Sequence, residues 1–153
     1  MNSVGELVTT HWLGQGIKLR PGATESEITD FEAKYDVCLP EDMREFLAVV
    51  NGFDNRSGEE VDSDMITFFS LEEIKPLNAS DWGVASRAES YFVFADWSIS
   101  AHVYAVRLLN DCAASSPVVV VYDALVQVAD SFAEFMQAYL EGNKAVLFPE
   151  PQG

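Results

Sequence analysis

The sequence predicts an α+β protein in which a central, mostly antiparallel sheet is packed at one side by helices. Three observations predict this class. Capped amphipathic helical patterns fill much of the first third of the chain, strand-like segments follow between residues 65 and 123, and a last helical pattern runs from 131 to 142. N-terminal helices, a run of strands and a C-terminal helix are typical of α+β folds rather than alternating α/β folds.

The first clear helical pattern begins at Thr24. Glu27 stands three residues later, so the two side chains can form a capping box that satisfies free N–H groups of the first turn. Ile28, Phe31 and Tyr35 then follow at i, i+3 and i+7, which places them on one face. The pattern predicts an amphipathic helix that ends near residue 36.

A second helical pattern lies within the stretch from Val37 to Phe53. Pro40 suits the first turn of a helix, because the N–H groups of that turn have no acceptor within the helix and the missing N–H of proline costs nothing there. Asn51 and Gly52 both tolerate the left-handed conformation, so we expect them to end this helix. Its apolar stripe favours a scaffold rather than a catalytic role; the stripe consists of Met43, Phe46, Leu47 and Val50.

Segments rich in β-branched and aromatic residues predict four strands. The alternation in the second of them is imperfect, which indicates that both faces of the sheet are partly covered. Pro76 rules out one long helix between the first two strands, although a single helical turn fits Leu71 to Ile74. The four segments are Met65–Ser70, Tyr91–Trp97, His102–Leu108 and Pro117–Asp123.

A closing helix is predicted from Ser131, which can cap the backbone while Glu134 lies at the third helical position. Gly142 stops it. Its apolar stripe is expected to pack on the sheet; it comprises Phe132, Phe135, Met136, Tyr139 and Leu140.

The composition is that of one globular domain. Of 153 residues, 48% are hydrophobic, so we expect a single domain over 1–148 and a loose tail at 149–153, where prolines discourage regular structure. Nine Lys and Arg against 25 Asp and Glu give a formal net charge of −16. This charge argues against nucleic acid and anionic membranes as partners and favours basic proteins. A role of the charge in solubility alone is the alternative.

The sequence also predicts the cellular location of the protein and the state of its two cysteines. No apolar segment is long enough to span a membrane and the N-terminus lacks the features of a signal peptide, so a cytoplasmic location is the default expectation. Cys38 and Cys112 lie in separate apolar contexts with no Cys-x-x-Cys pairing. We interpret them as packing thiols rather than as a disulfide or a zinc site.

The partner-binding residues are predicted mainly in an acidic segment, residues 54–64. Its carboxylates lack the register of a calcium-binding loop, so a basic partner is the simpler interpretation, with a solvated loop as the alternative. Trp82 beside Asp81 combines an aromatic anchor with a carboxylate and is a second candidate, whereas Trp97 is expected in the core. The acidic candidates are Asp54, Glu59, Glu60, Asp62 and Asp64.

Catalysis has little support in the sequence. His11 and His102 are the only histidines, and a dyad of His102 with Cys112 lacks a glycine-rich oxyanion loop. No glycine-rich phosphate loop is present. A pair of carboxylates that catalyses glycoside hydrolysis is left open as an alternative, because the abundance of acidic residues does not show how they are arranged in space. We therefore predict no catalytic residue, no cofactor and no metal site.

An ordered set of motifs resembles the SUKH superfamily, whose founding eukaryotic member is a yeast regulator of cell-wall synthesis and whose bacterial members are mostly immunity proteins. The resemblance covers about residues 25–140, is loose between Gly52 and Tyr91, and does not include the first 20 residues. The matching motifs are "ATESEITDFEAKYDVCLPEDMREFLAVVNGF", "YFVFADW", "HVYAVRL" and "VADSFAEFMQAYL".

The resemblance implies an α+β fold and a non-enzymatic role in protein binding. For a bacterial member it implies an immunity protein that neutralises a basic toxin, in many cases a nuclease, by covering its active site with an acidic surface. The alternative is a housekeeping regulatory or scaffolding protein of the same fold that binds an endogenous partner through the sheet face.

Overall fold

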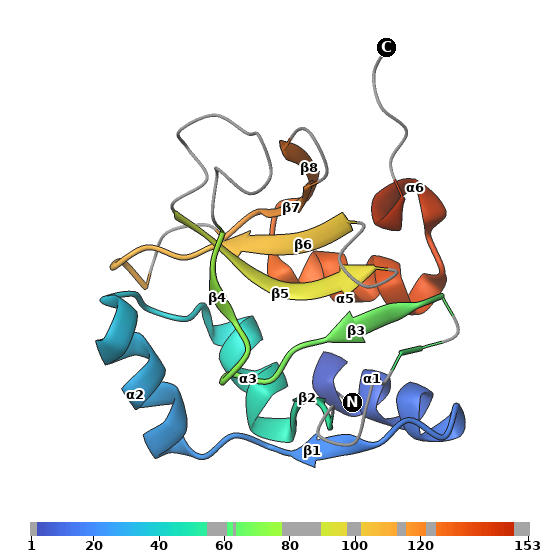
Figure 1. Ribbon diagram of the computed structural model, residues 1–153, viewed down its shortest axis with the longest axis horizontal. Helices are drawn as coiled ribbons and strands as arrows, with labels where there is room; N and C mark the ends of the chain where they lie inside the picture. The colour runs from blue at the N-terminus through green and yellow to red at the C-terminus, as the bar shows by residue number, and fades with distance from the viewer. Residues whose placement is uncertain are drawn as a thin grey trace.

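A computed structural model of the chain (Figure 1) describes residues 3–54, 61–62, 64–77, 90–97, 102–112, 116–121 and 125–148. The helices in this part are α1 (Val4–Gly14), α2 (Glu25–Tyr35), α3 (Glu41–Val49), α5 (Phe132–Glu141) and α6 (Lys144–Leu147). The strands are β1 (Leu19–Pro21), β2 (Val50–Phe53), β3 (Ile66–Phe68), β4 (Lys75–Pro76), β5 (Tyr91–Trp97), β6 (His102–Arg107), β7 (Val118–Val121) and β8 (Leu125–Ala129). The predicted α+β class is confirmed.

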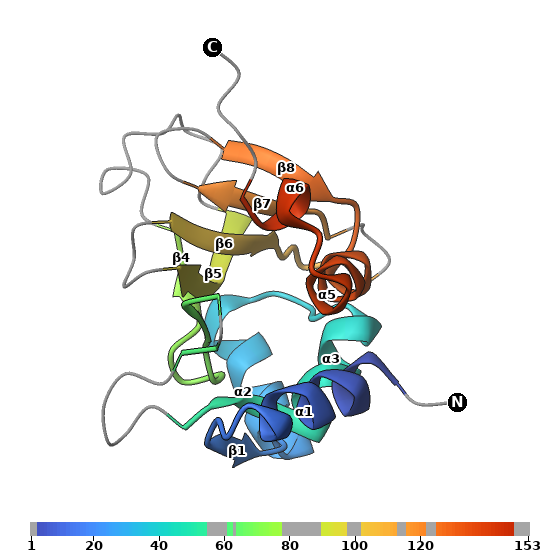
Figure 2. The same cartoon turned by 90° about the vertical axis from the view of Figure 1, so that its right-hand side faces the viewer.

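The larger sheet is antiparallel throughout, with strand order β3-β5-β6-β7-β8 and with β4 paired to the other half of β5. A small sheet of β1 and β2 lies apart from it. Figure 2 shows the larger sheet in the upper part of the molecule and α1, α2, α3 and β1 below it. Helices α5 and α6 also contribute to the core on this side, through Phe132, Phe135 and Leu147, so the helices pack at one side of the sheet, as predicted.

The main core fills the space between the sheet and the helices. Trp12 of α1 is fully buried at its centre, with its ring 4.9 Å from the rings of both Phe53 and Phe68. The opposite face of the sheet carries a second buried cluster that includes Val93, Val103 and Val119. A shift of register between Val93 and Ala95 turns both Phe94 and Ala95 toward the main core, which explains the imperfect alternation of β5.

The predicted helix starts at Thr24 and Ser131 are confirmed, whereas Pro40 is the N-cap of α3 rather than a residue of its first turn. Thr24 and Glu27 form a complete capping box, with Thr24 N–H to Glu27 at 2.9 Å and Glu27 N–H to Thr24 at 3.1 Å. Ser131 accepts from the N–H of Glu134 at 3.1 Å. Gly142 ends α5 with a φ of +70°. These helix starts could be predicted from the sequence because each cap is formed by two residues that are three positions apart.

Several elements escaped the sequence prediction. Helix α1 is capped by Ser3 and Glu6 in a second capping box, a signal that the N-terminal sequence does carry. Strands β1 and β8 and helix α6 were also not predicted. Trp97, expected in the core, is partly buried and packs against the main core at the end of β5, beside His102 and Phe148.

The expected role of Asn51 and Gly52 was wrong. Helix α3 ends at Val49, and the chain enters β2 directly through Val50, which has an extended backbone. Asn51 and Gly52 are buried residues of that strand. Gly52 has a φ of +72°, and a Cβ there would lie 2.4 Å from the carbonyl carbon of Phe69. Gly52 therefore serves a close contact with the Phe69–Ser70 backbone, and Asn51 accepts a hydrogen bond from the Leu71 N–H; neither is a helix cap.

The expected role of the cysteines was also wrong. Cys38 and Cys112 form a disulfide, although 74 residues separate them. Cys38 N–H donates to the Leu109 carbonyl at 2.9 Å, and Asn110 donates to Asp36 at 2.9 Å, so the α2–α3 connection lies against the end of β6. This proximity comes from tertiary packing, which a cysteine spacing does not reveal.

Candidate functional site

The acidic segment is attached to the core at its C-terminal end by Asp62. This side chain is 5% exposed, and one carboxylate oxygen accepts from the N–H groups of Asp64 at 2.8 Å and Ile66 at 2.9 Å. The other oxygen accepts from the hydroxyl of Tyr139, which in turn accepts from Trp12 Nε1 at 2.7 Å. A buried charge needs donors of this kind. Asp62 therefore holds the segment in place rather than facing a partner.

The buried chain from Trp12 to Asp62 also fixes the ionisation of its central hydroxyl. Burial and then the negative charge of Asp62 raise the pKa of Tyr139 far above its ordinary value. Tyr139 therefore stays neutral and keeps its proton as the donor to Asp62. Three distant parts of the chain, α1, α5 and the acidic segment, meet at this point.

The other described members of the segment lie nearer the surface. Asp64 pairs with Lys144 of α6 at 2.7 Å, and the backbone N–H of Asp54 donates to the Lys18 carbonyl at 2.8 Å. The segment is thus tied at both of its ends. Glu59, Glu60, Asp81 and Trp82 lie outside the described residues, so their place in a binding surface stays a prediction.

A cleft that the sequence did not reveal lies between α2 and the turn at Ser70–Ile74. It has a volume of about 280 Å³. Its apolar wall is formed by Phe31, Tyr35 and Leu71, and charged side chains stand around it. We call it the α2 cleft; its lining residues are Glu27, Asp30, Phe31, Lys34, Tyr35, Leu71 and Glu72.

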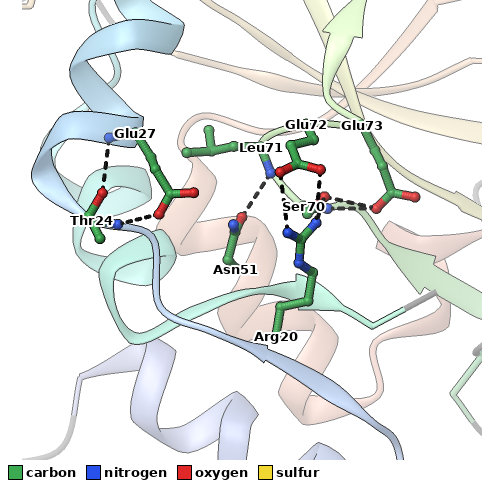
Figure 3. A network of polar contacts seen from close by, with 8 residues as sticks. All are labelled: Arg20, Thr24, Glu27, Asn51, Ser70, Leu71, Glu72 and Glu73. Carbon is green, nitrogen blue, oxygen red and sulfur yellow. Dashed lines mark hydrogen bonds and ion pairs between the residues drawn. The ribbon is translucent and has the colours of Figure 1, made fainter. Parts of the chain in front are cut away.

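A polar network, drawn in Figure 3, fixes the turn that forms one wall of this cleft. The buried amide of Asn51 accepts from the Leu71 N–H at 2.8 Å. Arg20 donates to Ser70 at 2.9 Å and pairs with Glu72 at 3.3 Å. The buried hydrogen bond between Asn51 and Leu71 is costly to leave unmade, so the position of the turn is well defined.

The same turn is also held by its own local contacts. Glu73 accepts from both the N–H and the hydroxyl of Ser70, at 2.9 and 3.1 Å. The predicted helical turn at Leu71–Ile74 is present as a turn closed by Ile74 N–H to the Ser70 carbonyl at 3.0 Å. The turn itself could therefore be predicted from the local sequence. The hydrogen bonds that Asn51 and Arg20 make to it depend on long-range packing.

A catalytic dyad of Cys112 and His102 is not formed. Cys112 is in the disulfide and offers no thiol. His102 packs on Trp97 at 4.9 Å between ring centroids, and burial lowers its pKa. Among the described residues no group of three or more His, Cys, Asp or Glu is arranged to hold a metal ion, and no helix there could cross a membrane.

The fold and the site define an α+β protein with an acidic segment tied to its core and a small amphipathic cleft. The chain belongs to the SMI1 / KNR4 family (SUKH-1), which matches residues 22–138. The predicted membership of the SUKH superfamily is thereby confirmed. The family is associated with protein–protein interaction, and its members are generally non-catalytic binding modules. No curated protein gives a significant match to the chain.

Proposed function

We propose that this chain is an immunity protein that binds a basic toxin, such as a nuclease, and covers the toxin's active site with an acidic surface. The observation that carries the proposal is a net charge of −16 on a member of a protein-binding family. A nuclease presents a cationic cleft to phosphate, so an acidic protein complements it and associates with it quickly. In this role the chain is not an enzyme.

The acidic segment is the binding surface in this proposal. Its two ends are held, by Asp54 N–H to the Lys18 carbonyl and by the buried Asp62, while Glu59 and Glu60 lie between them in sequence. Holding the ends of a loop lowers the entropy that it loses on binding. Asp64 on the same segment, and Asp81 and Trp82 elsewhere, complete the proposed set.

The test is a complex with the product of the neighbouring gene. Purified chain is mixed with the adjacent gene product, and association is followed by surface plasmon resonance at several salt concentrations. We expect rapid association that slows as salt rises, because steering between unlike charges is screened. Absence of a complex with any toxin encoded beside the chain would favour the regulatory or scaffolding alternative.

A charge-reversal pair tests the surface itself. Glu59→Lys with Glu60→Lys is expected to slow association with the toxin by roughly 10-fold or more at low salt. Glu45→Lys with Glu141→Lys makes the same change of net charge on exposed residues of α3 and α5 and serves as the control. Equal effects of the two pairs would show that only overall charge matters and would reject the acidic segment as the binding surface.

A cytoplasmic location is part of the proposal, because a nuclease toxin is neutralised where its substrate lies. The Cys38–Cys112 pair provides a test, since disulfides persist in oxidising compartments and are rare in the cytosol. Thiol alkylation in intact cells followed by mass spectrometry measures the state of this pair. A cytoplasmic chain is expected to hold Cys38 and Cys112 as thiols in the cell, with the disulfide of the structure formed only on exposure to an oxidant. Recovery of the chain with both cysteines oxidised would instead place it in an oxidising compartment.

A further inference from the structure

The α2 cleft has the size and the lining of a site for one amphipathic side chain. Its volume of about 280 Å³ lies just below the range for small-molecule sites, which begins near 300 Å³, and suits a single side chain. Phe31 and Leu71 are buried and Tyr35 is half-buried, so one wall offers aromatic and aliphatic surface. Charged side chains stand at the opening, where the end of a bound side chain would lie.

The charges around the cleft favour a cation. Among the residues that the structure describes, three carboxylates and one ammonium line it, which leaves an excess of negative charge. Glu27 is engaged in the capping box of α2, and Glu72 pairs with Arg20. Asp30 is exposed, and no hydrogen bond or ion pair is found for it among the residues that the structure describes. Asp30 is therefore the carboxylate that can accept a new partner without losing an existing one.

The protein's own lysine indicates where a cation is stabilised. Lys34 Nζ lies 5.2 Å from the centroid of the Tyr35 ring, a distance at which the ring attracts a positive charge. Lys34 is also exposed and lines the cleft. It is one turn from Asp30 on α2, yet the two do not form an ion pair in the described structure. Lys34 thus competes with any incoming cation for the same aromatic face.

We propose that the α2 cleft binds an arginine side chain carried by a protein partner. A guanidinium group is planar and weakly hydrated, so it stacks on an aromatic ring and donates two parallel hydrogen bonds to a carboxylate, which lysine cannot match. The methylene groups of the arginine lie along Phe31 and Leu71, and the guanidinium reaches Tyr35 and Asp30. The proposed toxin is one source of such an arginine, and to that extent the inference rests on the proposed function.

The experiment uses the full chain and a small probe. Isotope-labelled protein is titrated with N-acetyl-arginine amide and followed by NMR, and the amides of α2 and of residues 71–72 are expected to shift. For a probe of this size a Kd on the order of 1 mM is expected. N-acetyl-citrulline amide has nearly the same shape without the charge, and N-acetyl-lysine amide has the charge without the planar group. Both are expected to bind at least about threefold more weakly.

Two substitutions locate the site. Asp30→Asn is expected to weaken arginine binding by about two- to fivefold, the range for an exposed ion pair. Lys34→Met removes the competing ammonium and is expected to strengthen binding by a similar factor. Glu141→Gln removes one negative charge from α5, away from the cleft lining, and is expected to leave binding unchanged.

Several results would overturn the proposal. These are shifts outside the cleft, equal binding of the lysine or citrulline probe, and an Asp30→Asn effect no larger than that of Glu141→Gln. The toxin experiment separates this inference from the proposed function. A toxin complex without arginine binding rejects the cleft alone, whereas arginine binding without any toxin complex rejects the proposed function and leaves the cleft as a site for another arginine-bearing protein.

Discussion

At the scale of single residues, Tyr139 shows how one hydroxyl connects three parts of the chain. It accepts from the indole of Trp12 and donates to the carboxylate of Asp62, and all three side chains are buried. Each polar atom in the series has a partner, so the cost of burying a charge is offset by charge-assisted hydrogen bonds. The end of the acidic segment consequently has a fixed position relative to α1 and α5.

Replacement of Gly52 by alanine is expected to destabilise the fold strongly for the addition of one methyl group. A Cβ at this position would meet the Phe69 carbonyl carbon at 2.4 Å, and the φ of +72° is itself unfavourable for other residues. Gly52→Ala is expected to lower the free energy of unfolding by about 3 kcal/mol or more, since both backbone strain and a backbone clash are introduced. Urea denaturation measures the change.

Gly142→Ala provides the matched control for Gly52→Ala. Gly142 has nearly the same φ, +70°, but in the described part of the chain no atom beyond its own neighbours lies within 4 Å of the added Cβ. Its replacement is expected to cost only about 1 kcal/mol, the penalty of the left-handed conformation alone. Equal losses for the two variants would mean that the Phe69 backbone can move away and that the close approach is not required.

At the scale of elements, the disulfide joins the α2–α3 connection to the segment after β6. The two Cα atoms are 5.1 Å apart across a separation of 74 residues. A cross-link over so long a loop restricts the unfolded chain considerably. The α2–α3 connection precedes the helix that leads into Asn51, so the disulfide supports the same region that positions the α2 cleft.

Removal of the disulfide is therefore expected to destabilise the fold. Cys38→Ser with Cys112→Ser should lower the free energy of unfolding by about 2–4 kcal/mol, the range for a native cross-link of this kind. Urea denaturation of the oxidised protein, of the double variant and of the protein in dithiothreitol measures the effect. The reduced protein is expected to match the double variant, and unchanged stability in dithiothreitol would contradict the prediction.

At the scale of the whole molecule, the net charge of −16 on 153 residues opposes compactness. Like charges repel one another across the surface, and this repulsion is released when the chain unfolds and expands. Ion pairs such as Arg44 with Glu32 at 2.7 Å and Lys144 with Asp64 neutralise part of the charge locally. With only nine Lys and Arg, most carboxylates have no cation available to pair with them.

Salt is accordingly expected to stabilise the protein. Raising sodium chloride from about 0.01 M to 0.1 M shortens the screening length from roughly 30 Å to 10 Å. We expect Tm to rise by about 3 °C, the shift that corresponds to roughly 1 kcal/mol for a chain of this size. Differential scanning calorimetry measures it, with tetramethylammonium chloride as a check on ion-specific effects. A constant or falling Tm would contradict the prediction.

The fold class and the helix starts could be predicted because they depend on local patterns. Thr24 with Glu27, and Ser131 ahead of Glu134, are caps whose partners lie three residues apart. The candidate site could be predicted only in part. Asp62 is buried, whereas the side chain of Asp64 is 33% exposed and pairs with Lys144. No local sequence feature distinguishes these two residues. The difference depends on Tyr139, which is 77 residues away from Asp62.

The sequence by itself determined the α+β class, the family and the acidic character of this protein. These follow from periodicity, capping residues, ordered motifs and counted charges, each of which is a local or a summed property. Tertiary structure decided that Asn51 and Gly52 belong to a strand, that Cys38 meets Cys112 and that the α2 cleft exists. The physical reason is that burial and contact depend on neighbours brought together by packing, over separations that a one-dimensional pattern does not encode.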